Sequence, residues 1–236
     1  MRIKTPYQIN EELSVQTSIV GIEEEKVLII DNFLKNPDEL VDLAVSQTFT
    51  PYNTQYPGIK SPAPAEYTRE LLGRLVPIIA NHYDLPPRQH LECSNCSFSL
   101  VTLPENDLNL IQRAPHRDSS YPFQFAVLLY LCDAEHGGTS FYRHNLTQFE
   151  TISPAKSAIY DHVCANDVAQ NGEPEARYQQ ESDRRYDKIG EVDIRFNRLV
   201  VYRSWLLHSA RINPRKSVDA NPRTGRLTLN SFLIFS

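Results

Sequence analysis

The chain has 236 residues, 41% of them hydrophobic, and its 24 Lys and Arg residues against 29 Asp and Glu residues give a net charge of −5. This length fits one domain with a substantial buried core. A negative net charge gives no general attraction for nucleic acid, which is therefore not an expected partner. The first residues lack the apolar core of a signal peptide, and no apolar run is long enough to cross a membrane. We therefore expect a cytoplasmic protein without membrane association.

The start of the chain combines a strand with the start signals of a helix. Residues 1–25 are polar and acidic, and we expect an irregular or edge segment there. Residues 27–30 are apolar and predict a buried strand. Asn36 before Pro37 is typical of a helix N-cap followed by the first helical residue, so a helix should extend to about Gln47.

Two further segments complete the N-terminal part. Residues 51–64 contain four prolines and predict a loop near the mouth of the β structure. Residues 67–83 carry apolar side chains at helical spacing and predict a second helix, which Pro77 should kink. Both helices are expected to pack on the outside of a sheet.

From residue 93 onward the pattern changes to that of strands. Short strands separated by Pro, Gly and Asn turns predict a mainly β protein with flanking helices, a β-sandwich or double-sheet jelly roll. Residues 166–192 are polar and charged and interrupt this pattern, so we expect a lid insertion there. We expect a single domain over residues 1–236, in which 1–90 support the jelly-roll core at 93–236. The predicted strands are 96–103, 125–131, 139–144, 157–162, 197–202 and 225–235.

A candidate metal site lies at the end of one predicted strand. His116 and Asp118 are two residues apart, and such positions share a face of a strand roughly 7 Å apart. One imidazole and one carboxylate can therefore reach the same ion. His208, beyond the predicted strand at 197–202, would complete a set of two histidines and one carboxylate. This set leaves coordination positions open, as in non-heme iron(II) oxygenases.

Four motifs that contain these residues occur in a fixed order. They are H-R-D at 116–118, L-L-Y-L followed by G-G-T-S-F, R-L-V-V-Y before His208, and G-R-L-T at 225–228. In this order they resemble the 2-oxoglutarate and iron(II)-dependent dioxygenases, in the branch of the prolyl hydroxylases. The resemblance covers about residues 98–235, and residues 27–43 are similar to the family's N-terminal strand and helix.

The resemblance implies a fold, a set of cofactors and an iron site. The fold would be a double-stranded β-helix, a jelly roll of the cupin-like class. The cofactors and co-substrates would be Fe(II), 2-oxoglutarate and O2. His116, Asp118 and His208 would be the iron ligands and the catalytic residues.

The resemblance also implies an arginine on the last strand that holds the far carboxylate of 2-oxoglutarate. The match to G-R-L-T nominates Arg226, with Thr228 and Tyr130 as hydroxyl donors. A planar guanidinium suits this task because it can bind a carboxylate through two parallel hydrogen bonds. Arg226 follows His208 at a greater distance than is usual in the family, so we expect an inserted loop. The alternative arginines are Arg211, Arg215 and Arg223.

Other residues near the motifs have weaker claims to a role. His136, His144 and His162 are expected to be turn and surface residues. Tyr202 and Trp205 flank His208 and either belong to the core or line a pocket. Arg195 and Arg203 either meet a substrate carboxylate or face solvent.

The expected function is that of a 2-oxoglutarate-dependent hydroxylase acting on an amino-acid-like, peptide or natural-product substrate, with succinate and CO2 as co-products. Asp118 favours hydroxylation or desaturation over halogenation, because related halogenases lack this carboxylate. A demethylase or desaturase on the same site, a non-catalytic cupin-like binding module and a nucleic-acid dealkylase are the alternatives. The sequence leaves the substrate and the oligomeric state open.

Overall fold

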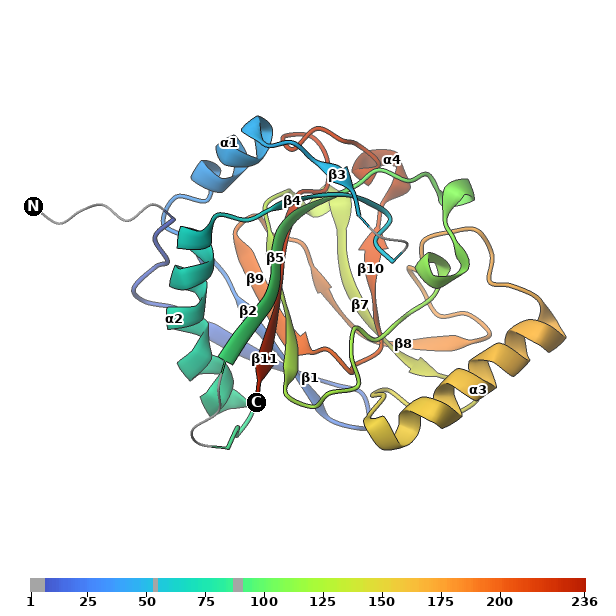
Figure 1. Cartoon of the computed structure of the whole chain (residues 1–236). Helices are drawn as coiled ribbons and strands as arrows, with labels where there is room; N and C mark the ends of the chain where they lie inside the picture. The colour runs from blue at the N-terminus through green and yellow to red at the C-terminus, as the bar shows by residue number, and fades with distance from the viewer. Residues whose placement is uncertain (1–6, 53–54, 87–90) are drawn as a thin grey trace, which may run out of the picture.

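The computed structural model describes residues 7–52, 55–86 and 91–236. Its strands form two antiparallel sheets that pack face to face, with helices at the periphery (Figure 1). The small sheet has the order β10 (His208–Ile212), β7 (Gly137–His144) and β8 (Tyr186–Asp193). The large sheet has the order β1 (Val15–Val20), β2 (Glu25–Ile30), β9 (Arg198–Arg203), β6 (Gln124–Tyr130), β11 (Thr228–Phe235), β5 (Leu91–Val101), β4 (Gly58–Pro62) and β3 (Thr50–Pro51).

Two helices from the first third of the chain cover the outer face of the large sheet, α1 (Asp38–Ser46) and α2 (Ala65–His82). A third helix, α3 (Pro154–Asn171), lies at the side of the small sheet in Figure 1. None of the described helices has the length and apolarity that crossing a membrane requires. The remaining helical turns are α4 (Pro214–Ser217), η1 (Glu105–Asp107), η2 (Leu110–Arg113) and η3 (Ala134–His136).

Alternation along the central strands separates two cores. On β6, Phe125 and Val127 pack in the cluster formed with α1 and α2, whereas Ala126 and Tyr130 pack in the cluster between the sheets. This division follows from the period of two in a strand, which sends neighbouring side chains to opposite faces. The same alternation on β11 sends apolar residues toward the helices and leaves a polar residue, Thr228, on the face between the sheets.

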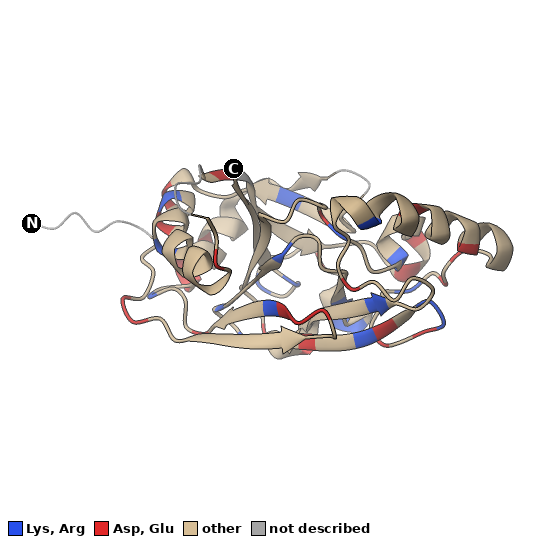
Figure 2. Cartoon of the chain, turned by 90° about the horizontal axis from the view of Figure 1, so that it is seen from below, with Lys and Arg blue, Asp and Glu red and all other residues tan. Residues whose placement is uncertain are grey.

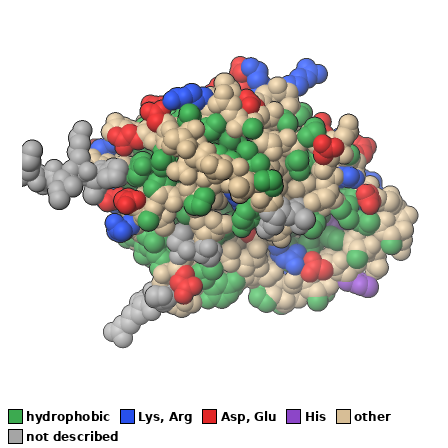
Figure 3. All heavy atoms as spheres, turned by 45° about the horizontal axis from the view of Figure 1, so that its top comes forward, with side chains coloured by type: hydrophobic (Ala, Val, Ile, Leu, Met, Phe, Trp, Pro, Cys, Tyr) green, Lys and Arg blue, Asp and Glu red, His purple; other side chains and the backbone are tan. Residues whose placement is uncertain are grey.

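Charged and apolar side chains share the surface. Figure 2 shows Lys and Arg interspersed with Asp and Glu along the outer strands and α3, where Arg117 pairs with Asp161 at 2.9 Å. Figure 3, with the top of Figure 1 turned forward, shows apolar side chains across the centre of this face and charged ones around its edge. This mixture of both signs matches the modest net charge.

Most predicted elements are confirmed, and three predictions need correction. Residues 157–162 lie in α3 and form no strand, because Pro154 starts a helix and the apolar run at 158–160 is too short to distinguish a strand from a helix. Residues 51–64 hold β3 and β4 in addition to loop, with 53–54 outside the described residues. The N-cap of α1 is Pro37, without a side-chain cap. The helix α2 continues across Pro77, and a kink at this residue stays a prediction.

The structure also places the predicted N-terminal edge segment and the predicted lid insertion. In residues 1–25, of which 1–6 lie outside the described residues, β1 forms an edge of the large sheet, as predicted. Residues 166–192 comprise the end of α3, a connecting loop and most of β8, which pairs with β7. Movement of this segment as a lid stays a prediction.

Gly137 permits the close pairing of β7 with β10, and replacing it should destabilise the protein. An added Cβ would lie 1.9 Å from the Arg211 carbonyl oxygen, at a residue whose φ is +103°. We expect Gly137→Ala to lower the free energy of unfolding by about 3 kcal/mol or more. Gly73→Ala is the matched control, because it lies in α2 with no heavy atom within 4 Å of an added Cβ. The control should gain about 0.5–1 kcal/mol. Urea unfolding measures the stability of both variants. Equal stabilities would contradict the close pairing of β7 with β10.

Candidate metal centre

A backbone pairing brings the two predicted histidine ligands together. The His116 N–H donates to the His208 carbonyl and the His208 N–H donates to the His116 carbonyl, each at 2.9 Å. Directly opposed residues of an antiparallel pair place their side chains on one face. Asp118, two residues later, is held by a hydrogen bond from its N–H to the Ser204 carbonyl at 2.9 Å. The segment around His116 thus extends the small sheet beyond β10.

The three side chains converge on one point. Asp118 lies 3.6 Å from His116 Nε2 through Oδ1 and 3.3 Å from His208 Nε2 through Oδ2. One ligand atom from each residue lies within 4.8 Å of the others. His208 Nδ1 is 2.8 Å from the Leu206 carbonyl, so Nδ1 carries the donated hydrogen and Nε2 is available as a ligand. This set of donors fits a divalent transition metal with open positions.

Asp118 and His208 attract each other electrostatically. Burial disfavours the charged form of each side chain, but their mutual attraction outweighs it. The pKa of Asp118 is therefore held well below its usual range, and the pKa of His208 is raised.

The three side chains line an inner cavity of about 200 Å³ between the sheets. Tyr202 also lines it, with its ring 4.8 Å from that of His208. Trp205 does not line this cavity. Its indole N–H donates to Glu25 at a distance of 3.0 Å. Tyr202 is thus a pocket residue and Trp205 packs beside the core.

A ladder of paired residues crosses the inner face of the large sheet, and one of them, Lys60, lines the inner cavity. Thr228 on β11 pairs with Tyr130 on one side and with Ser99 on the other, and Ser99 pairs with Lys60 on β4. Cross-strand partners share a face, so these four side chains point toward the small sheet. Arg226 precedes Thr228 by two residues and lines the same cavity.

The guanidinium of Arg226 is buried without an acidic partner among the described residues. The residue is 2% exposed, Nη2 donates to the Gly138 carbonyl at 3.0 Å, and Nε has no partner. The Arg226 Cζ lies 5.9 Å from the centre of the Tyr130 ring. An unpaired buried charge is strongly unfavourable, so a cavity that contains one is suited to an anionic ligand.

Hydroxyl groups surround this guanidinium. Thr228 Oγ1 and the Tyr56 hydroxyl are buried without hydrogen-bond partners, whereas the Tyr130 hydroxyl bonds to Thr139 Oγ1 at 2.6 Å. Burial raises the pKa of Tyr56 to about 12, although Arg226 acts in the opposite direction, so Tyr56 is a hydrogen-bond donor at neutral pH. Sequence reasoning missed Tyr56, because its segment shows only the proline pattern of a loop.

The alternative arginines have other partners or lie outside this cavity. Arg211 on β10 forms ion pairs with Asp193 and Glu191, and Arg223 pairs with Asp42 at 2.7 Å. Arg215 is exposed in α4. Arg195 pairs with Asp31 at 2.9 Å, and Arg203 lies 3.7 Å from Glu25.

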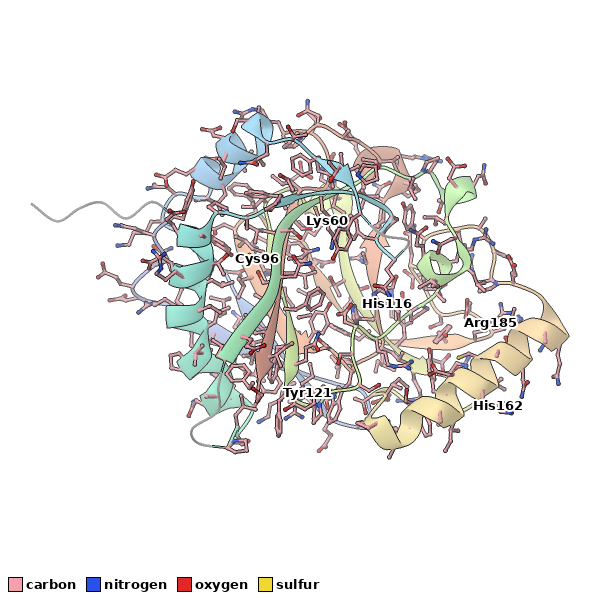
Figure 4. All side chains as sticks on the ribbon, viewed as in Figure 1. Lys60, Cys96, His116, Tyr121, His162 and Arg185 are labelled. Atoms are coloured by element: carbon pink, nitrogen blue, oxygen red, sulfur yellow. The ribbon has the colours of Figure 1, made fainter. Side chains whose placement is uncertain are left out.

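Two of the remaining histidines correct the prediction of surface residues. His136 and His144 are 5% and 1% exposed, respectively. His136 packs against Ser217, and His144 packs between the rings of Tyr160 and Tyr186. His162 is exposed on α3, as predicted (Figure 4). None of the three lines the inner cavity.

A second, outer cavity of about 370 Å³ shares His116 and Asp118 with the inner one. Arg117 also lines it, but the two terminal guanidinium nitrogens of Arg117 donate to Asp161. A molecule in the outer cavity would therefore lie directly beside the candidate metal position. The other lining residues are Tyr52, Gln55, Asn95, Ile111, Gln124 and Phe232.

Comparison with known proteins defines the family. The model of the family of unknown function DUF6445 matches residues 11–233, so the chain belongs to that family. No curated protein matches the sequence. The structure is similar to that of the non-heme alpha-ketoglutarate-dependent carbocyclase SnoK from nogalamycin biosynthesis, with 11% identity and a TM-score of 0.50 over 91% of this chain and 81% of SnoK. It also matches HygX from Streptomyces hygroscopicus, determined with nickel and 2-oxoglutarate bound, with 13% identity and a TM-score of 0.49 over 90% and 84% of the respective chains. The likeness to SnoK shows a shared fold of antiparallel sheets with flanking helices.

Removal of His208 should abolish tight metal binding. We expect His208→Ala to weaken Ni(II) binding by more than about 100-fold, because even residues that only support a metal ligand contribute about 10- to 100-fold. His162→Ala removes an exposed imidazole and should leave the affinity unchanged. Isothermal titration of both variants measures the difference. Equal affinities would show that nickel binds elsewhere.

Proposed function

We propose that the protein is a non-heme Fe(II) and 2-oxoglutarate-dependent oxygenase that hydroxylates a C–H bond of a small-molecule or peptide substrate. One observation carries this proposal. A single inner cavity contains the His116, Asp118 and His208 cluster together with the buried, unpaired guanidinium of Arg226. A metal position and an anion position in one chamber suit a ligand with a chelating end and a carboxylate at its other end.

In this proposal the two sheets are the halves of a double-stranded β-helix. The strands β5, β11, β6 and β9 would be one half, and the segment at His116 with β10, β7 and β8 the other. The likeness to SnoK in fold supports this assignment. The closer resemblance to prolyl hydroxylases rests on the sequence motifs alone.

The cavity residues divide into two groups. His116, Asp118 and His208 would hold iron, and the Leu206 carbonyl orients the His208 ring. Arg226 would bind the far carboxylate of 2-oxoglutarate, with Thr228 as a hydroxyl donor. The buried atoms Arg226 Nε and Thr228 Oγ1 lack partners in the described structure and would gain them from that carboxylate.

The surrounding residues would orient and shield this arrangement. Tyr130 packs its ring beside Arg226 and holds Thr139, which limits the positions open to the guanidinium. Tyr56 would add a second hydroxyl donor, because its unpaired hydroxyl is buried near Arg226. Tyr202 excludes water from one wall. Iron(II) and 2-oxoglutarate, once bound, supply oxidation of a C–H bond by O2, with succinate and CO2 as co-products.

Two alternatives use the same chamber differently. A demethylase or desaturase would have the same residues and differ only in the substrate C–H bond that faces the metal. A non-catalytic cupin-like binding module would not need the buried charge of Arg226. The carboxylate of Asp118 occupies the ligand position that halogenases leave to chloride, which disfavours halogenation.

Anaerobic addition of 2-oxoglutarate to the Fe(II)-loaded protein should produce the weak visible charge-transfer band of a chelated keto acid. We expect Arg226→Leu to weaken 2-oxoglutarate binding by roughly 100-fold while Fe(II) binding persists, because two charge-assisted hydrogen bonds are lost. Arg211→Leu is the matched control and should bind 2-oxoglutarate like the wild type. Unchanged affinity in Arg226→Leu would refute the role of Arg226, and no band in the wild type would refute the proposed function.

A further inference from the structure

The inner cavity contains a second cation, Lys60 on β4, that the proposed chemistry does not use. Its ammonium lies 4.2 Å from the centre of the Tyr52 ring and 4.8 Å from that of Tyr56. Lys60 and His116 both line the inner cavity and come from opposite sheets (Figure 4). Strand pairing fixes this direction, because Lys60 is paired with Ser99 in the ladder on the inner face of the large sheet.

The ammonium of Lys60 has no acidic partner at hydrogen-bond distance in the described part of the chain. Its contacts are two aromatic faces, which attract a cation more weakly than a carboxylate does. Burial lowers the pKa of Lys60 to about 8, against the attraction of Asp118, so the group is mostly charged at pH 7. A partly buried charge held this way is ready to pair with an anion.

Tyr56 separates the two cations of the cavity. Its hydroxyl lies in the electrostatic environment of Arg226, whereas the face of its ring carries Lys60. A single carboxylate would therefore not pair with Lys60 and Arg226 at the same time. Tyr52, the other ring below Lys60, also lines the outer cavity. Lys60 thus lies toward the entrance, and Arg226 lies deeper.

The net charge of the inner cavity also favours a further anion. The ionic side chains that line it, apart from the two histidines, are Asp118, Arg226 and Lys60. Addition of a divalent metal and of doubly charged 2-oxoglutarate leaves one net positive charge. An anionic substrate group would neutralise it in a space where unpaired charge is unfavourable.

We propose that Lys60 binds an anionic group of the substrate, and that the substrate of this oxygenase is a carboxylic acid. The inference rests on the proposed function and adds the substrate class. Lys60 acts as a substrate-binding residue in the inner cavity, which shares His116 and Asp118 with the outer one. The rest of the substrate would occupy the outer cavity. Beyond the candidate metal ligands His116 and Asp118, its walls are apolar and neutral polar side chains apart from Arg117, which is already paired with Asp161.

The test uses Fe(II)-loaded protein under anaerobic conditions. The 2-oxoglutarate affinity is measured first, for the wild type, Lys60→Met, Lys60→Arg and Lys216→Met. The last variant removes the same charge from an α4 lysine whose side chain is 55% exposed. Each complex is then titrated with N-acetyl-L-amino acids and with their matched carboxamides, and the shift of the visible band reports binding beside the metal.

We expect all four proteins to bind 2-oxoglutarate within about twofold of one another. At least one acid should shift the band in the wild type and in Lys216→Met, with binding roughly tenfold or more weaker in Lys60→Met. Lys60→Arg should retain part of the affinity, and the matched carboxamide should bind weakly to all four proteins.

Several outcomes would overturn the inference. A tenfold loss of 2-oxoglutarate affinity in Lys60→Met would assign Lys60 to the co-substrate. No response to any acid, equal responses to acids and carboxamides, or equal binding of the acid by Lys60→Met and wild type would exclude an anionic substrate group at Lys60. Absence of the 2-oxoglutarate band in the wild type would instead overturn the proposed function itself.

Discussion

The backbone pairing between His116 and His208 is the constraint on which the site depends. Two hydrogen bonds of 2.9 Å join segments that are far apart in the chain and place both imidazoles on one face. The same segment then fixes Asp118 through its N–H bond to Ser204. Neither histidine could meet the carboxylate without this extension of the small sheet. The candidate metal position is therefore a product of strand pairing at the edge of the small sheet.

The large sheet forms the other wall of the inner cavity, and its two faces differ in composition. Its outer face is apolar and buried by α1 and α2, which stabilises the sheet. Its inner face carries polar residues where β4, β5, β11 and β6 cross the cavity. Buried polar atoms without partners, such as Arg226 Nε and Thr228 Oγ1, are unfavourable unless a ligand pairs with them. The outer face thus contributes stability, and the proposed ligand site lies on the inner face.

Sequence patterns predicted the parts of the molecule that are locally encoded. The strands at 125–131 and 225–235 are long apolar or alternating runs. The spacing of His116 and Asp118 predicted that their side chains could meet, although His116 forms only an isolated bridge and Asp118 lies in a bend. The first part of α3 was predicted as a strand because the apolar run at 158–160 is too short to distinguish the strand period from the helix period.

Residues that enter the site through distant strand pairing could not be predicted. Lys60 and Tyr56 belong to a proline-containing segment with no chemical motif, and only the pairing of β4 with β5 brings them to the cavity. The burial of His136 and His144 likewise depends on packing against Ser217 and the aromatic rings of α3 and β8. Such contacts depend on the whole topology.

A crystal structure of the protein with Ni(II) and 2-oxoglutarate would test the central claim most directly. The account predicts nickel bound by His116, Asp118 and His208, with the keto acid end of 2-oxoglutarate on the metal and its far carboxylate against Arg226 and Thr228. Nickel at a different set of residues, or 2-oxoglutarate bound outside the inner cavity, would contradict it.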